Sequence, residues 1–291
     1  RAPSMDLEAI DHEPSCRRTR VRFDRCLPQV LTRTRSHHAH TLLIDPSRRS
    51  ILYRPFSILE RPEVEDIRQW VVQRYIDRPL LIDGRKFHVR VYVVAIGTLQ
   101  VYVFHRALAL FSLHPYSPTE LQNLYAHITN TCYQKQGSTD DEPFDEERAV
   151  WLFDEMCEHA AALLVAEGRS PDELAAMLWR QIDAIVRETF EACIREAGYT
   201  PLCNAFEFYG FDFIIDEELH VWLLEVNAGP DMGQTGERLR NAVVQPLVNG
   251  AVSLVLEHLF PDDDIEPTHD DDAANSSLFE CVLSDGSAHS R

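Results

Sequence analysis

Two carboxylates and one amide fall within a segment that is expected to form an apolar hairpin. Asp212 and Glu225 belong to residues 211–226, where two apolar stretches flank a charged turn at residues 217–218, and Asn227 follows directly. Because side chains alternate along a strand, Glu225 and Asn227 share one face. These residue types offer oxygen atoms to a metal ion.

The register expected for this hairpin brings Asp212 to the same face. A turn at residues 217–218 pairs Asp212 with Leu223, so Asp212 lies diagonal to Glu225 at ~7 Å, near enough to share one ion. The opposite face is wholly apolar, which predicts that the carboxylates are buried. Buried carboxylates need a compensating charge, and oxygen ligands suit Mg²⁺. The alternative is a structural acid paired with an arginine.

A second predicted hairpin carries the opposite charge. Lys86, His88 and Arg90 lie two residues apart along one strand, so all three share a face. If residues 97–98 form a two-residue turn, His105 lies across from Arg90 on that face. A row of cations on a sheet binds anions, and phosphate is the natural one. Together the two hairpins predict a nucleotide and Mg²⁺ held between sheets.

Common nucleotide-binding and hydrolase motifs do not account for this site. The first glycine is Gly84, so neither a P-loop nor a dinucleotide-binding fingerprint occurs before it. A G-x-S-x-G nucleophile elbow is also absent.

Composition narrows the class of protein further. The net charge of −19 disfavours nucleic acid as a partner. The seven cysteines are scattered and never spaced C-x-x-C, which favours a reducing compartment and a cytoplasmic location. No uninterrupted apolar stretch approaches the ~20 residues of a membrane span, and the first residues lack a signal-peptide pattern, so no membrane partner is expected.

The predicted elements alternate between strands and helices. Strands are expected at 41–44, 70–76, 86–96 and 99–105, and helices at 119–128, 145–167, 170–197 and 237–260. Ser170 and Glu173 form a capping box at the start of the third helix, and Pro246 kinks the last one. Residues 1–62 are expected to be a basic, weakly ordered region, residues 63–260 the main domain, and residues 261–291 an acidic disordered tail.

Several segments, taken in order and spacing over residues 65–240, resemble the tubulin–tyrosine ligase family. They are residues 73–76 (QRYI), 79–90 (PLLIDGRKFHVR), 127–131 (HITNT), 206–212 (FEFYGFD) and 222–227 (WLLEVN). Residues 108–111 (LALF) and 204–207 (NAFE) are most similar to the fungal branch of the family.

The resemblance implies an α+β, ATP-grasp-like fold, with mixed or antiparallel sheets packed with helices. It implies an ATP- and Mg²⁺-dependent ligase that joins a free amino acid to a carboxylate of a protein acceptor, tubulin being one candidate, through an acyl phosphate. Carried over by position, the adenine contacts are Gln73, Arg74, Tyr75 and Ile76. The remaining ATP contacts are Lys86, His88, Thr129 and Asn130, the metal ligands are Asp212, Glu225 and Asn227, and the catalytic residues are Arg90 and Lys86.

The sequence departs from the family pattern at three places. His88 stands where the family motif most often has aspartate, and Leu110 where animal ligases have a second arginine that helps hold substrate. The Gly-rich stretch that covers the phosphates has only residues 53–55 and Ile58 as near counterparts, which predicts an incomplete N-terminal lobe. The alternative function is therefore a catalytically impaired pseudo-ligase that acts as a nucleotide-binding scaffold or adaptor.

Overall fold

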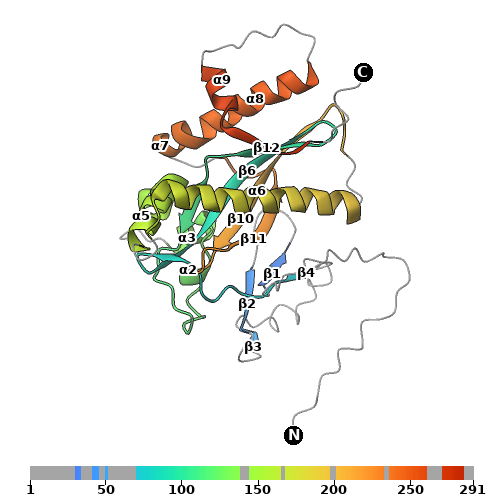
Figure 1. Cartoon of the computed structure of the whole chain (residues 1–291). Coiled ribbons are helices and arrows are strands. Elements are labelled where there is room, and N and C mark those ends of the chain that lie inside the picture. The colour runs from blue at the N-terminus through green and yellow to red at the C-terminus, as the bar shows by residue number, and fades with distance from the viewer. Residues whose placement is uncertain are drawn as a thin grey trace, which may run out of the picture.

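The computed structural model describes residues 30–33, 41–45, 50–51, 70–137, 144–164, 168–196, 201–232, 236–260 and 271–284. In these residues a large antiparallel sheet carries helices on both faces, and a small antiparallel sheet forms from N-terminal residues (Figure 1). This is the α+β class that the sequence predicts.

The large sheet has eight strands, five of which follow the order β11-β10-β6-β7-β12, while β5 and β8 also pair with β6, and β9 pairs with β8. Its strands are β5 (Leu81–Ile82), β6 (Arg85–Ile96), β7 (Gln100–Phe104), β8 (Leu108–Phe111), β9 (Val150–Leu152), β10 (Phe206–Ile215), β11 (Val221–Ala228) and β12 (Phe279–Ser284).

The central strand β6 is buried over all twelve of its residues, and its two faces meet different partners. Phe87 and the alternate residues after it join the core cluster that includes α5 (Phe153–Leu163) and α6 (Pro171–Glu196). On the other face, Val94 and Ile96 pack against α8 (Gln245–Leu259). The charged residues of β6 precede these on that second face, so the candidate site begins where the apolar packing ends.

The hairpin between β6 and β7 has a three-residue turn, one residue longer than expected. Ile96 pairs with Gln100, and Gly97 and Leu99 both have positive φ. The extra residue shifts the register, so the expected position of His105 across from Arg90 is wrong. His105 instead stacks on Trp179 and bonds to Asp183.

Helix α6 begins at the predicted capping box. The Glu173 carboxylate accepts a hydrogen bond from the Ser170 N–H at 2.9 Å, and the Ser170 hydroxyl accepts one from the Glu173 N–H at 3.2 Å. These contacts satisfy two backbone donors that the first helical turn leaves without partners. In Figure 1 this long helix runs across one face of the sheet.

Two predicted helices are shorter than expected. The continuous helix at 145–167 is wrong: α4 (Glu146–Ala149) and α5 are separated by β9, which pairs with β8 because its β-branched and aromatic residues favour a strand. The helix at 119–128 is reduced to α2 (Leu124–His127), and α3 (Thr131–Gln136) follows it. Asn123 bonds through its side chain to His114 instead of extending α2.

The predicted kink at Pro246 takes the form of a π-helical segment. The last long helix runs as α7 (Glu237–Leu239), η3 (Arg240–Val244) and α8. Proline has no N–H, so the carbonyl of Ala242 lacks its usual helical donor. Arg106 donates to that carbonyl at 2.9 Å.

Among the described residues, one helix, Glu237–Leu259, is long and apolar enough to cross a membrane by length and composition. Leu239, Val243, Leu247 and Ala251 of this helix are buried against the large sheet. A helix that packs one apolar side against a sheet in this way is typical of a folded domain.

The expectation of a disordered tail is wrong for residues 271–284. Helix α9 (Asp271–Ser276) packs on α8, and β12 pairs with β7. Gly250 of α8 allows the close approach, because a Cβ there would lie 2.6 Å from the backbone oxygen of Asn275. The acidic residues 262–264 and 270–272 led to a prediction of disorder from composition, although the paired strand β12 follows them.

The small sheet has the order β3-β2-β1-β4. Its strands are β1 (Val30–Arg33), β2 (Thr41–Asp45), β3 (Ser50–Ile51) and β4 (Trp70–Val72), and β2 confirms the strand expected at 41–44. β1 pairs with β4, so this sheet joins residues on both sides of the boundary expected at residue 62. The domain boundaries themselves stay a prediction.

Candidate functional site

The predicted row of cations is present on one face of β6. Lys86, His88 and Arg90 are only 6%, 5% and 7% exposed, so these polar groups lie inside the fold and need internal partners. Strand β10 supplies one of those partners. Its Asp212 lies directly beside Arg90 on β6.

The two charged rows therefore lie on neighbouring strands of one sheet, and the expectation of two sheets facing each other is wrong. Arg90 donates to both carboxylate oxygens of Asp212, through Nε to Oδ1 and through Nη2 to Oδ2 at 2.9 Å. Burial lowers the pKa of Arg90, but the charge and hydrogen bonding of Asp212, with smaller contributions from Tyr92 and Glu225, together outweigh it and raise the pKa. Burial alone would raise the pKa of Asp212, but Arg90 outweighs it and lowers the pKa. The arginine partner considered as an alternative for Asp212 is thus present.

A β-bulge brings the carboxylates closer than expected. The register shifts between Asp212 and Phe213, so Asp212 pairs directly with Glu225, and the predicted pairing with Leu223 is wrong. The extra residue at the bulge is Leu224, whose carbonyl accepts a hydrogen bond from the Gln73 side chain at 2.9 Å. The first of the expected adenine contacts, Gln73, is therefore bonded to β11 at the bulge.

Glu225 differs from Asp212 because no lysine, arginine or histidine forms an ion pair with it among the described residues. Burial raises the pKa of Glu225, and the negative charge of Asp212 raises it further. Asn227 donates to Glu225 Oε1 at 3.2 Å. The described part of the chain has no group of three His, Cys, Asp or Glu side chains suited to a metal. The expected metal set combines two carboxylates with one amide.

Lys86 is held by neutral groups. Its Nζ donates to Tyr75 Oη at 3.1 Å and to the carbonyl of His127 at 3.0 Å, and it lies over the Tyr75 ring. Tyr75 Oη and His127 Nδ1 are 2.7 Å apart. Burial lowers the pKa of Lys86 to about 7 and that of His127 to about 4. With no carboxylate to neutralise it, protonated Lys86 offers its charge to an anion.

The loop before α3 covers the middle of the row. His88 Nδ1 lies 2.6 Å from Thr129 Oγ1, and burial lowers the pKa of His88 to about 4, so its ring is neutral at pH 7. Asn130 uses its side-chain oxygen to cap α3, accepting from the N–H groups of Cys132 and Tyr133. The structure thus brings Thr129 into the site and gives Asn130 a structural role beside it.

Two buried atoms on this face lack hydrogen-bond partners within the described residues. They are Nε2 of His88 and Oη of Tyr92, and no other buried side-chain nitrogen or oxygen in that part shares this condition. Both residues lie on the face of β6 that carries Arg90, one on each side of it. Buried polar atoms without a partner are rare, and a ligand is one of the usual reasons for them.

The sequence prediction missed three residues of this site. Tyr92 continues the alternation of the charged row but reads as an ordinary strand residue. His127 was visible only within the family-like segment, without a role. Gly210 pairs with Tyr92, and a Cβ there would lie 2.8 Å from Pro230 and 3.3 Å from Arg90, so only glycine leaves room for the Arg90 side chain.

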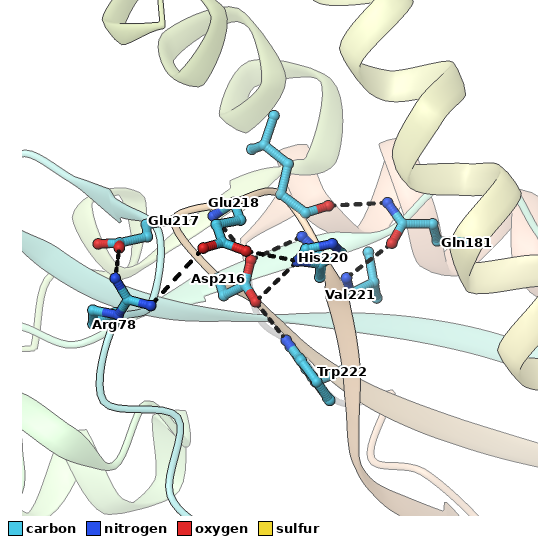
Figure 2. Close-up of polar contacts among 9 residues, drawn as sticks. Arg78, Gln181, Asp216, Glu217, Glu218, His220, Val221 and Trp222 are labelled. Atoms are coloured by element: carbon cyan, nitrogen blue, oxygen red, sulfur yellow. Dashed lines mark hydrogen bonds and ion pairs between the residues drawn. The ribbon is translucent and has the colours of Figure 1, made fainter. Parts of the chain in front are cut away.

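The other expected adenine contacts lie by the turn between β10 and β11. Arg74, Tyr75 and Ile76 line a pocket of about 260 Å³ together with residues of that turn. Figure 2 shows the turn, where the Asp216 carboxylate accepts from the backbone N–H groups of Glu218 and His220 and from Trp222 Nε1 at 2.8 Å. Arg78 pairs with Glu217 at 2.5 Å.

Of the three departures from the family pattern, Leu110 and His88 lie within the described residues, and the third does not. Leu110 pairs with His88 across the sheet and is 2% exposed in an apolar cluster. His88 faces Asp212, with Nε2 at 3.8 Å from Oδ2. Residues 53–55, the nearest counterpart of the phosphate-covering stretch, are not among those described.

The class of protein follows from comparison with solved structures. The crystal structure of the C-terminal domain from K. lactis Pby1, described as an ATP-grasp enzyme interacting with the mRNA decapping enzyme Dcp2, is similar with a TM-score of 0.54 and 27% sequence identity. The match covers 88% of this chain and 62% of that one. The predicted ATP-grasp-like fold is confirmed.

The chain belongs to the tubulin–tyrosine ligase family, whose sequence profile matches residues 31–264. It is 36% identical over 223 residues to the "Probable tubulin–tyrosine ligase PBY1" of Saccharomyces cerevisiae, covering 70% of this chain and 27% of that protein. It is 35% identical over 201 residues to a probable tubulin–tyrosine ligase of Schizosaccharomyces pombe, covering 68% and 44%. It is 34% identical over 163 residues to the "Probable tubulin polyglutamylase TTLL2" of Homo sapiens, covering 55% and 26%. The match therefore spans less than half the length of each of these relatives.

Proposed function

We propose that this chain is an ATP- and Mg²⁺-dependent ligase that joins the amino group of a free amino acid to a carboxylate of a protein acceptor. The acceptor carboxylate attacks the γ-phosphorus of ATP and ADP leaves, giving an acyl phosphate. The amine then attacks the acyl carbon, phosphate leaves, and the nitrogen loses a proton to give an amide.

The observation that carries this proposal is the pair of unpartnered buried atoms on either side of Arg90. His88 Nε2 and Tyr92 Oη lie on the face that also holds Lys86, whose own partners are neutral. A polyanion on this face would meet the lysine charge and offer acceptors to donors that are otherwise without a partner.

Each predicted site residue has a proposed task. Gln73, Arg74, Tyr75 and Ile76 hold the adenine end, and Lys86, His88, Thr129 and Asn130 hold the ribose and phosphates. Arg90, with Lys86, stabilises charge on the reacting phosphoryl or acyl group.

Asp212, Glu225 and Asn227 would hold Mg²⁺, which neutralises phosphate charge when it is bound. The residues fit this ion because they offer oxygen ligands. A carboxylate has about four lone-pair positions, so the two contacts of Asp212 with Arg90 leave others for a cation. Glu225 lacks a positive partner in the described part of the chain, so a divalent cation would compensate its charge.

A catalytically impaired pseudo-ligase is the second candidate, and Leu110 favours it. The residue that replaces the substrate-holding arginine of animal ligases is buried among apolar side chains, where it cannot contact a charged substrate. In that case the chain would bind nucleotide as a scaffold or adaptor. For either function we propose a cytoplasmic protein with a protein partner, tubulin being one candidate.

Thermal unfolding with Mg²⁺ and ATP, followed by an ADP-release assay with mixed amino acids and candidate acceptors, tests the proposal. We expect ATP to raise the melting temperature, and Glu225→Gln to fold but release ADP at least about 100-fold more slowly, as for loss of one transition-state contact. Glu188→Gln, at an exposed position of α6, is the matched control.

The outcomes separate the two candidates. ADP release by Glu225→Gln at the wild-type rate would contradict the metal assignment, and a melting shift without ADP release would favour the scaffold. No shift at all would reject both functions. Mass spectrometry of the acceptors then identifies which amino acid is transferred.

A further inference from the structure

We propose that Tyr92 is a further substrate-binding residue of this site, and that its hydroxyl donates a hydrogen bond to a carboxylate oxygen of a substrate. Two carboxylates qualify, that of the protein acceptor and that of the free amino acid. The inference rests on the proposed function, because it adds one residue and its task to the same site.

The Tyr92 hydroxyl is a buried donor without an acceptor. The residue is 0% exposed, and its Oη has no hydrogen-bond partner among the described residues. Burial raises the pKa of Tyr92 above the ordinary value of 10.0, so the hydroxyl keeps its hydrogen at neutral pH. That hydrogen rotates about the C–O bond and can face an acceptor that arrives with a ligand. A buried hydroxyl without a bond costs free energy, so a ligand oxygen would stabilise it.

The order of residues along β6 places Tyr92 at the substrate end of the row. Lys86 marks the nucleotide end, because it donates to Tyr75, one of the expected adenine contacts. Arg90, to which we assign the reacting group, follows four residues later on the same face. Tyr92 lies ~7 Å beyond Arg90, since two residues of a strand advance by that distance. A group bound there lies on the far side of the reacting centre from the nucleotide, where the substrates of the transfer have to lie.

The surroundings of Tyr92 fix its ring and keep its hydroxyl near charge. The ring belongs to the apolar cluster that contains Leu239. Besides burial, the charges of Arg90, Asp212 and Asp231 act on the pKa of Tyr92. The hydroxyl therefore lies near the charged row and near the loop after β11, where Asp231 is exposed.

The pairing of β6 with β10 brings this loop to Tyr92. Tyr92 pairs with Gly210, where a Cβ would lie 2.8 Å from Pro230 of the same loop. The loop thus contacts the sheet directly beside Tyr92. At this border between loop and sheet a substrate carboxylate would meet Tyr92 and Arg90 together.

Tyr92→Phe tests the inference, because it removes only the hydroxyl oxygen. Tyr102→Phe is the matched control, since the Tyr102 hydroxyl donates to Gln100 Oε1 at 2.6 Å on β7. Urea unfolding, the melting shift with ATP and Mg²⁺, and ADP release are measured for both variants and the wild type. Poly-L-glutamate and tubulin serve as acceptor probes at low concentration.

The amine is supplied in two ways, as mixed amino acids or as hydroxylamine. Hydroxylamine attacks the acyl carbon of the acyl phosphate, phosphate leaves, and the nitrogen loses a proton to give a hydroxamate. It has no carboxylate, so it separates the two carboxylates. A defect of Tyr92→Phe that persists with hydroxylamine assigns the bond to the acceptor, and a defect seen only with amino acids assigns it to the amino acid.

We expect Tyr92→Phe to unfold at a higher urea concentration than the wild type, because it removes a buried hydroxyl without a partner. ATP should raise its melting temperature as much as that of the wild type. Its ADP release with amino acids should be at least about tenfold slower, as for loss of one hydrogen bond to a charged group. Tyr102→Phe should gain no stability and should keep the wild-type rate.

Three results would overturn this inference and leave the proposed function in place. They are ADP release by Tyr92→Phe at the wild-type rate with both amines, unfolding of this variant at a lower urea concentration than the wild type, and loss of its ATP-induced melting shift. The second would show that the hydroxyl has a partner in the free protein, and the third that it binds the nucleotide. Absence of ADP release by the wild type would overturn the proposed function, and this inference with it.

Discussion

Lys86 and Arg90 lie four residues apart on the same face of β6, and both are almost fully buried, yet their charges have opposite surroundings. Arg90 is paired through two hydrogen bonds with Asp212, which raises its pKa. Lys86 meets a phenol and a carbonyl, and burial lowers its pKa to about 7. One end of the row is therefore neutralised within the fold, while the other end keeps a charge that is available to a ligand.

This difference separates two kinds of residue in one site. The Arg90–Asp212 pair joins two strands and should matter for stability as well as for chemistry. Lys86 costs stability when charged, because the ammonium is removed from water without an anion. A bound phosphate would supply that anion, so Lys86 is suited to couple ligand binding to its own protonation.

The largest effect should come from breaking the pair at Arg90. Arg90→Met leaves Asp212 buried without its cation, and we expect a loss of about 3–5 kcal/mol in the free energy of unfolding. Urea titration measures this loss. The double variant Arg90→Met/Asp212→Asn should recover most of it. A loss in the double variant equal to the sum of the losses in Arg90→Met and Asp212→Asn would show that the two residues are not energetically coupled.

A smaller effect on the free energy of unfolding is expected at Lys86, and it depends on pH. The folded pKa of about 7 lies below the ordinary value of 10.5, so the unfolded chain binds more protons between these pH values. The free energy of unfolding should then rise with pH through this window, by up to about 1.4 kcal/mol per unit. Over the same window ATP affinity should fall by up to about tenfold per unit, since the ammonium is lost.

Lys86→Met is the matched variant for this test. Both pH dependences should disappear in it, as measured by urea unfolding and by nucleotide titration from pH 6 to 9. Wild-type stability and affinity that change in the same direction would contradict the assignment of the free charge to Lys86.

The smallest effect should come from Tyr75→Phe, which removes one of the two oxygens that hold Lys86. The carbonyl of His127 remains, so we expect a loss of about 1 kcal/mol in the free energy of unfolding. Tyr209→Phe, whose hydroxyl donates to the Glu207 carboxylate at an exposed position, is the control, and urea titration measures both losses. A loss as large as that of Arg90→Met would mean that the lysine end also holds the strands together.

Strand alternation was sufficient to predict most of the charged row. It placed Lys86, His88 and Arg90 on one face, and the hairpin pattern placed Asp212 near Glu225, because both are local properties of the chain. The pairing of β6 with β10 joins segments more than a hundred residues apart, which no local pattern encodes. The sequence therefore could not reveal that Arg90 and Asp212 are direct neighbours.

Single-residue irregularities account for other differences. The bulge after Asp212 and the additional turn residue at Leu99 each shift a register by one, and each changes which side chains meet. Composition was misleading near the C-terminus, where the acidic runs predicted disorder although β12 is a paired strand. At Pro246 the sequence predicted an irregular helix, and a π-helical segment precedes the proline.

Strand β12 also has a protective consequence for the sheet. Without residues 279–284, β7 would be an edge strand with a row of unpaired N–H and C=O groups, and such edges recruit other extended chains. The last described strand thus protects β7 from β-augmentation, and removing it would favour self-association through β7 even with every residue of the candidate site in place.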